Sequence, residues 1–179
     1  RAYVETYLTE EIKAEALTRN LGAFIRFLPM AAAESGHSVN ASNIGREVGV
    51  SYKTVQEYFQ ILEDTLLGFT LEPWRKARKR RLSETAKFYL FDIGVANHLN
   101  PESTTVSEGT DLFGRAFEHF LLSEIRACLA YHQKSVPLSF WRTHSGLEVD
   151  LVLGEMDLAL EFRSSQRVRD ADLKGMRAL

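Results

Sequence analysis

Acidic residues near the end of this 179-residue chain have the types and spacing of a metal or phosphate site. Residues 147–153 and 158–163 predict two strands of a hairpin, and one register makes one of its faces wholly apolar. In that register Asp150 lies directly opposite Glu161. Like charges at opposed positions, with Cβ atoms about 5 Å apart, are destabilising unless something cancels them. Because Mg²⁺ prefers one or two carboxylates with water and phosphate oxygens, the pair predicts a divalent-cation site.

Three further charged residues belong to this hypothesis. Glu148 flanks Asp150 and lies opposite Arg163 in the same register, while Glu118 projects from a predicted helix that could cover this face. Two alternatives stay open at this point. A solvated polar face would tolerate two carboxylates at little cost, and pairing of Arg163 with Glu148 across the strands would be a purely structural explanation of that arginine.

The elements that must position these residues form an α/β segment. A helix begins at a Thr110 cap and presents a wide apolar face made of Leu112, Phe113, Ala116, Phe117, Phe120, Leu121 and Ile125. Glu118 lies one turn after Gly114, where the missing side chain would let another element approach closely. Residues 138–143 predict a further strand before the hairpin.

The first half of the chain is predicted to be helical. Residues 3–17 favour helix, and a second helix runs from an Asn20 cap to residue 33. A short helix closed by Gly49 is followed by a longer one capped by Ser51, with Val55, Tyr58, Phe59 and Leu62 on its apolar face. Short helix, tight turn and longer helix is the helix-turn-helix pattern, and it leaves Lys53, Gln56, Glu57 and Gln60 outermost.

A basic loop makes this part resemble a winged helix. Seven basic residues and one acid, Glu84, lie between residues 75 and 87, flanked by short β-prone runs at 67–71 and 88–91. We expect this loop to lie against phosphate and the second helix to face the groove of a nucleic acid, DNA being favoured. The predicted contacts are Lys53, Gln56, Gln60, Arg75, Lys76, Arg78, Lys79, Arg80 and Arg81. The alternative is that the domain only packs against a neighbouring domain, since Glu57 would meet phosphate unfavourably.

Composition bounds the remaining possibilities. The chain is 45% hydrophobic with a net charge of −2, which is ordinary for a folded protein. It has no apolar run long enough to span a membrane, and its single cysteine, Cys128, gives no disulfide framework. We therefore expect a cytoplasmic protein with no membrane partner, and its oligomeric state stays open. The polar segment 101–105 predicts a linker between two domains, 1–100 and 101–179, cut from a longer protein.

The acidic residues then resemble a known constellation. An acid on a helix, Asp on a strand and Glu-x-Lys on the next strand is the arrangement of PD-(D/E)XK nucleases, matched here by Glu118, Asp150 and Glu161-Phe162-Arg163. More of the chain is similar to the C-terminal domain of unknown function 4143 of many bacterial and archaeal AAA-type ATPases. The runs that carry this resemblance are Asn20-Leu21-Gly22, Leu62-Glu63-Asp64-Thr65, Lys87-Phe88-Tyr89-Leu90-Phe91-Asp92, Phe117-Glu118, Trp141-Arg142-Thr143 and Gly146 to Asp150.

The resemblance implies a fold and an activity. The fold is α+β, with a helical winged-helix domain followed by a small nuclease-like α/β domain that is truncated at its C-terminus. It implies Mg²⁺ held by Glu118, Asp150 and Glu161, and Arg163 standing where the family has lysine, which is not a conservative exchange. It also implies an ATPase module of the same protein, N-terminal to this region, as the place of any ATP site, since this sequence has no P-loop. The competing hypothesis is a non-catalytic module that binds DNA or a protein partner.

Overall fold

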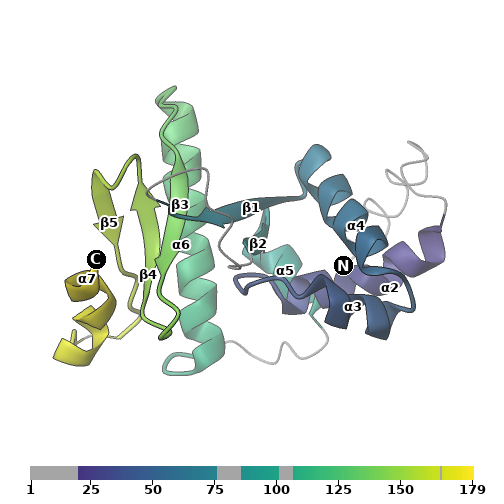
Figure 1. Cartoon of the computed structure of the whole chain (residues 1–179), viewed down its shortest axis with the longest axis horizontal. Coiled ribbons are helices and arrows are strands. Elements are labelled where there is room, and N and C mark those ends of the chain that lie inside the picture. The colour runs from purple at the N-terminus through teal and green to yellow at the C-terminus, as the bar shows by residue number, and fades with distance from the viewer. Residues whose placement is uncertain (1–19, 76–85, 101–106, 166) are drawn as a thin grey trace. The chain divides into compact units, whose positions relative to one another are not determined.

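The computed structural model describes residues 20–75, 86–100, 107–165 and 167–179 (Figure 1). It is a mixed α and β structure that confirms the predicted α+β class. The chain divides into two compact units, one made of residues 1–70 and 87–104, the other of residues 71–86 and 105–179. Among the described helices none is both long and apolar enough to cross a membrane. The predicted helix 3–17, the linker and most of the basic loop fall outside the described residues.

Four helices form most of the described part of the first unit: α2 (Leu21–Ala33), α3 (Ala41–Val48), α4 (Tyr52–Asp64) and α5 (Ile93–Leu99). The predicted apolar face of α4 is confirmed, because its four members are at most 8% exposed. Aromatic rings join α2 to α4: Phe24 meets Tyr58 edge-on at 5.0 Å between ring centres, and Phe27 meets Phe59 at 4.9 Å. This apolar contact fixes the helices of the first unit around one core.

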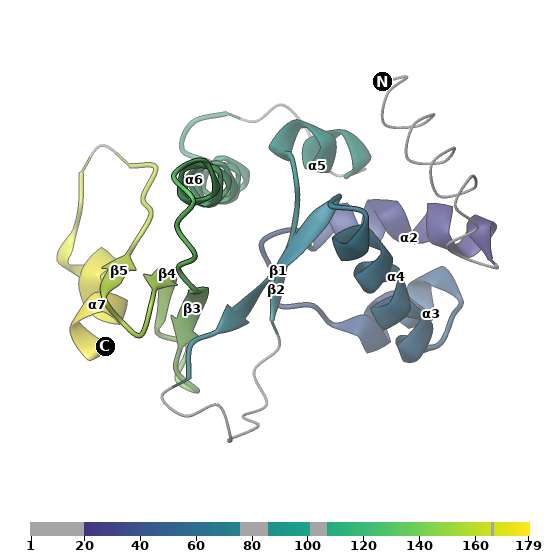
Figure 2. The same cartoon turned by 90° about the horizontal axis from the view of Figure 1, so that it is seen from above.

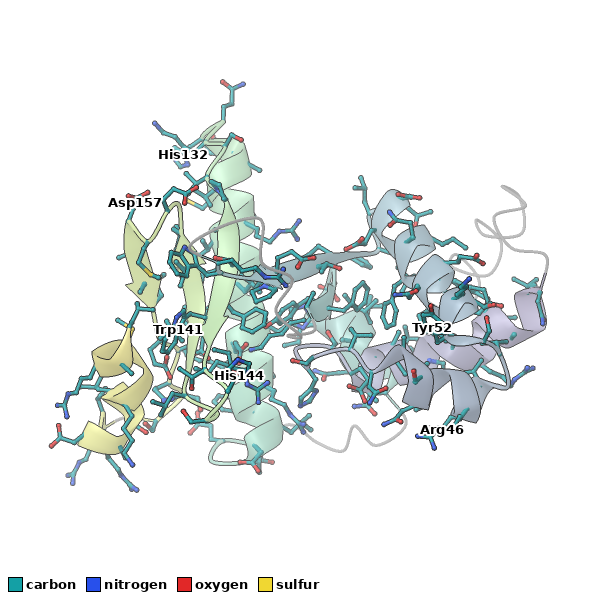
Figure 3. The ribbon with its side chains drawn as sticks, viewed as in Figure 1. Arg46, Tyr52, His132, Trp141, His144 and Asp157 are labelled. Carbon is teal, nitrogen blue, oxygen red and sulfur yellow. The ribbon has the colours of Figure 1, made fainter. Side chains whose placement is uncertain are left out.

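Local capping signals set the helix boundaries, as predicted at Asn20, Ser51 and Thr110. The side chains of Asn20, Ser51, Asp92 and Thr110 each accept a hydrogen bond from the backbone N–H three residues later. Gly49 ends α3 with a φ of 80°, a left-handed conformation that favours glycine. A Cβ on Gly45 would lie 2.7 Å from the carbonyl oxygen of Val50, so this glycine lets the turn between α3 and α4 close tightly. Arg46, in α3 before the turn, and Tyr52, at the start of α4 after it, are both exposed (Figure 3).

Five strands form a sheet in the order β2-β1-β3-β4-β5: β1 (Gly68–Pro73), β2 (Lys87–Leu90), β3 (Leu138–Arg142), β4 (Glu148–Leu153) and β5 (Leu158–Leu160). The second half of β1 runs parallel to β3, whereas β3–β4 and β4–β5 are antiparallel. The most buried strand residues of the second unit are Phe140, Val149, Leu151 and Val152, all at 0% exposure. The core of this unit therefore sits around β3 and β4.

Helices flank the sheet of the second unit. Helix α6 (Asp111–Tyr131) is seen end-on to one side of β3 and β4 in Figure 2. Near the chain end, the 3₁₀ helix η2 (Asp170–Leu173) leads into α7 (Lys174–Ala178). A Cβ on Gly175 would lie only 1.9 Å from the carbonyl oxygen of Glu148, so the missing side chain lets α7 approach the backbone of β4. The end of the chain is thereby packed against the strand that carries Asp150.

The predicted apolar face of α6 is buried less than expected. Its members are half-buried except for Phe120, which is 49% exposed, and the fully buried residues are His119 and Leu122. A helix that packs on a small sheet buries only the side chains that contact the sheet. The residues that share one face of α6 with the buried Leu122 are Glu118, Ile125 and Leu129. Glu118 thus lies on the inward side of α6, half-buried.

Candidate metal and phosphodiester site

The β4–β5 hairpin has the predicted register. Leu153 pairs with Leu158 and Leu151 with Leu160. The prediction that the second strand continues to residue 163 is wrong, because β5 ends at Leu160. Beyond that point the backbone N–H of Phe162 donates to Oδ2 of Asp150 at 2.7 Å. A side-chain carboxylate thus takes over as acceptor where the strand ladder stops.

A β-bulge places Asp150. On the other edge of β4, Ser139 is opposite Val152 while Trp141 is opposite Val149, so the single residue between them on β3 faces both Asp150 and Leu151. Such a bulge re-aims a side chain, and bulges are frequent beside active sites. Asp150 is 9% exposed, so its carboxylate is held inside the second unit. His144 and Asp157 mark the turns on either side of β4 (Figure 3).

The carboxyl of Glu161 has a pKa well above its ordinary value. Burial, the charge of Asp150 and the charge of Glu148 raise its pKa to about 7, while Arg163 and a hydrogen bond from the Asp150 backbone act in the opposite direction. Its side chain is 9% exposed, and its Oε2 atom is buried with no hydrogen-bond partner. The strand pairing ends at Leu151 and Leu160, so Asp150 and Glu161 are not a paired position of the ladder as predicted. Their carboxylates nevertheless repel each other, and one oxygen of Glu161 is buried without a hydrogen-bond partner.

Arg163 is not paired with Glu148 as the register had predicted. Its guanidinium donates to Oε1 of Glu161 and, at 3.1 Å, to the carbonyl oxygen of Phe162, and its Nε lies 3.7 Å from Oδ1 of Asp172. Glu148 instead pairs with Arg142 on β3 at 3.4 Å. The physical reason is that the chain leaves the ladder after Leu160, so the extrapolated register no longer places Arg163 opposite β4.

Glu118, the third acid of the predicted site, is on helix α6. The first turn of α6 runs beside the segment after β5, since a Cβ on Gly114 would lie 3.8 Å from Oγ of Ser164. That distance is ordinary contact, not the close approach predicted at this glycine. In the part of the chain that is described, no three His, Cys, Asp or Glu side chains gather closely enough to hold a metal ion, so Glu118 does not join Asp150 and Glu161 in such a group.

The donor set still fits a hard divalent cation held by two protein ligands. Mg²⁺ commonly takes one or two carboxylates and completes its shell with water and phosphate oxygens. Asp150 and Glu161 supply the carboxylates, and the partnerless Oε2 atom of Glu161 is a buried acceptor that a cation would satisfy. Asp172, which sequence reasoning missed, enters the site through Arg163. Nothing in its local sequence distinguishes it from the other acids near the chain end.

The predicted nucleic-acid residues are divided between the two units. Lys53, Gln56 and Gln60 are exposed on α4, and Gln60 donates to Asp64 at 2.8 Å. Arg75 is half-buried in the second unit. The other predicted basic contacts lie outside the described residues; these are Lys76, Arg78, Lys79, Arg80 and Arg81.

Comparison with known families assigns the first part of the chain. Residues 1–106, more than half of the chain, match the family model described as Domain of unknown function (DUF8612). The chain belongs to this family. The DUF8612 region contains the helices α2 to α5. Residues 113–179 match a second model, Domain of unknown function (DUF4143), which confirms the predicted resemblance for the α6 to α7 segment but not for nearly the whole chain.

Two curated relatives extend this result. The chain is 26% identical over 150 residues to uncharacterized protein Mb2031c of Mycobacterium bovis and, to the same extent, to uncharacterized protein Rv2008c of Mycobacterium tuberculosis. The aligned region covers 83% of this chain and 33% of each relative, so the chain spans about a third of the length of those proteins. No solved structure matches the chain significantly.

Proposed function

We propose that the second unit is a PD-(D/E)XK-like nuclease domain that cleaves phosphodiesters with Mg²⁺. The observation that carries the proposal is the pair of buried carboxylates, Asp150 at a β-bulge and Glu161 with a partnerless oxygen. Two like charges in a buried position are costly without a compensating cation. A carboxylate pair of this kind, on adjacent segments of a small sheet, is what a two-ligand Mg²⁺ site requires.

Each residue has a distinct role in this proposal. Asp150 and Glu161 hold the metal ion, and the Phe162 N–H fixes the orientation of the Asp150 carboxylate. Glu118, on the inward side of α6, assists through the metal or a water molecule. Arg163 stands in for the family's lysine by offsetting negative charge near the scissile phosphate. Bound Mg²⁺ supplies Lewis-acid polarisation of the phosphate and lowers the pKa of a bound water.

The first unit would bind duplex DNA. Helices α3 and α4, joined by the Gly49 turn, would act as a helix-turn-helix, and the β1–β2 hairpin would be its wing. The exposed residues of α4 would face the groove while the basic loop that contains Arg75 binds phosphate. We further propose that the parent protein carries an AAA-type ATPase module and works in the cytoplasm. A Walker motif encoded upstream of Arg1 in the gene would support the first of these proposals.

A non-catalytic module is the second candidate. Two observations favour it: Arg163 already forms an ion pair with Glu161, and Glu118 does not form a metal-binding group with the two acids in the described part of the chain. In that case the nuclease-like fold is a scaffold that binds DNA or a protein partner. Such a scaffold needs no metal, so metal binding separates the two candidates.

Calorimetric titration of Mn²⁺ and Mg²⁺ into the protein tests the proposal directly. We expect a one-site heat in wild type that Asp150→Asn abolishes and that Glu155→Gln, in the exposed hairpin turn, retains. Cleavage of plasmid DNA with Mg²⁺ should follow the same pattern, and Arg163→Lys should increase it if the missing lysine limits activity. Equal, negligible heats in wild type and Asp150→Asn would eliminate the metal site and leave the scaffold.

A further inference from the structure

The guanidinium of Arg163 lies between two acids that belong to different elements. It donates to the Glu161 carboxylate at the end of the hairpin, and its Nε lies 3.7 Å from Oδ1 of Asp172 in η2. The Arg163 side chain is 40% exposed, whereas Glu161 is 9% exposed. The arginine is therefore the solvent-accessible partner of this pair, and Glu161 is the buried one.

Asp172 is a fixed acceptor. Its Oδ2 atom accepts the backbone N–H of Arg169 at 2.7 Å, which leaves Oδ1 directed to Arg163. The side chain of Asp172 is 26% exposed, and α7, which follows η2 directly, is packed against β4 through Gly175. The position of Asp172 is thus set by backbone contacts that do not depend on Arg163.

The same Glu161 carboxylate faces two cations in turn. A guanidinium and a divalent cation repel each other strongly at the few ångströms that separate the two oxygens of one carboxylate. Binding of a metal ion to Asp150 and Glu161 therefore requires Arg163 to leave Glu161, and Asp172 is the acid within reach of the departing charge.

We propose that Arg163 is an internal cation that competes with the divalent metal for Glu161, and that Asp172 is the positioning residue that receives Arg163 when the metal binds. This inference rests on the metal site of the proposed function. In this inference Arg163 is a residue that lowers metal affinity, in addition to replacing lysine, and Asp172 is the acid that binds Arg163 when the metal is present.

The two residues have opposite effects on metal affinity. Arg163→Gln removes the competing charge and should tighten the dissociation constant for Mn²⁺ roughly threefold to tenfold. Asp172→Asn removes the receiving charge but keeps an oxygen for the Arg169 N–H, so Arg163 stays on Glu161 and Mn²⁺ binds roughly threefold more weakly. In the double variant the Asp172 effect should disappear, because no arginine remains to be received.

The experiment is a double-mutant cycle measured by titration of Mn²⁺ into the whole 179-residue chain, with no activity readout. Asp170→Asn is the matched control, since it removes the same charge from the same 3₁₀ helix but belongs to a pair with Arg177 at 2.8 Å. We expect this control to stay within about twofold of wild type, as a solvent-exposed ion pair contributes little. Asp172→Glu keeps the charge and should restore wild-type affinity if Asp172→Asn folds poorly.

The outcomes separate this inference from the function on which it rests. Absence of Mn²⁺ binding in every folded variant would remove the metal site itself. If wild type binds Mn²⁺ and Arg163→Gln binds it with equal or lower affinity, Arg163 does not compete with the metal for Glu161. An Asp172→Asn effect that persists in the Arg163→Gln background, or that Asp170→Asn reproduces, would overturn the positioning role and indicate a general effect of charge.

Discussion

The raised pKa of Glu161 makes a quantitative prediction about stability. The pKa is raised from 4.5 to about 7 because the carboxyl is buried next to Asp150. The folded protein therefore binds the Glu161 proton more tightly than the unfolded chain does. The stability that this group contributes is fully present below about pH 4.5 and is lost as pH rises through about 7.

The magnitude follows from linkage. A difference of about 2.5 pKa units corresponds to about 3.4 kcal/mol in total, of which about 2.5 kcal/mol falls between pH 5 and pH 8.5. Glu161→Gln replaces the titrating group by a neutral side chain of similar shape. The free energy of unfolding of the wild type should therefore fall by about 2.5 kcal/mol more than that of the variant over this range.

Urea unfolding with EDTA present, followed by tryptophan fluorescence, measures this difference. Both tryptophans, Trp74 and Trp141, belong to the unit that contains Glu161, so the signal reports on that unit. Comparing the two proteins cancels the titration of histidines and other groups that they share. Glu155→Gln, in the exposed turn of the hairpin, should give a curve parallel to wild type. A difference between wild type and Glu161→Gln that is the same at pH 5 and pH 8.5 would refute the buried carboxylate pair.

Three other predictions concern packing, capping and binding. Gly175→Ala should destabilise the second unit by about 1–3 kcal/mol, because its Cβ meets a β4 carbonyl oxygen, whereas Gly114→Ala on α6 should be neutral or stabilising by up to about 1 kcal/mol in the same urea assay. Ser51→Ala removes the N-cap of α4 and should cost about 1 kcal/mol in thermal unfolding, and a loss near zero would show that the cap is unimportant. Lys53→Ala should reduce the slope of log affinity for duplex DNA against log salt concentration by about 1. Lys134→Ala, in the second unit, should leave that slope unchanged. Equal slopes in wild type and in both variants would show that α4 does not contact the DNA.

Helix boundaries were predictable because capping is local. Asn20, Ser51, Asp92 and Thr110 each bond to a backbone N–H three residues away, so a short stretch of sequence contains both partners. The hairpin register was predictable for a related reason, since a slip of one residue would turn every apolar side chain to the opposite face. The burial of the α4 face follows from its helical spacing in the same way.

The extent of β5 and the partners of Arg163 were not predictable in this way. Extending the register past Leu160 placed Arg163 opposite Glu148, but the chain leaves the ladder there. Whether a strand continues depends on which acceptors its N–H groups meet, and Phe162 meets a carboxylate of the neighbouring strand. Asp172 reaches Arg163 from another element, and no periodicity links the two positions.

By itself, the sequence determined the α+β class, the caps at Asn20, Ser51 and Thr110, the β4–β5 register up to Leu160 and the repulsion between the carboxylates of Asp150 and Glu161. Only the tertiary structure decided that a β-bulge sets the Asp150 carboxylate, that one oxygen of Glu161 is buried without a partner, and that Arg163 bridges Glu161 and Asp172. The physical reason is the separation along the sequence between the residues that interact. Caps and register act between residues whose separation along the chain is fixed by helical or strand geometry, whereas burial and charge pairing depend on which distant elements pack together.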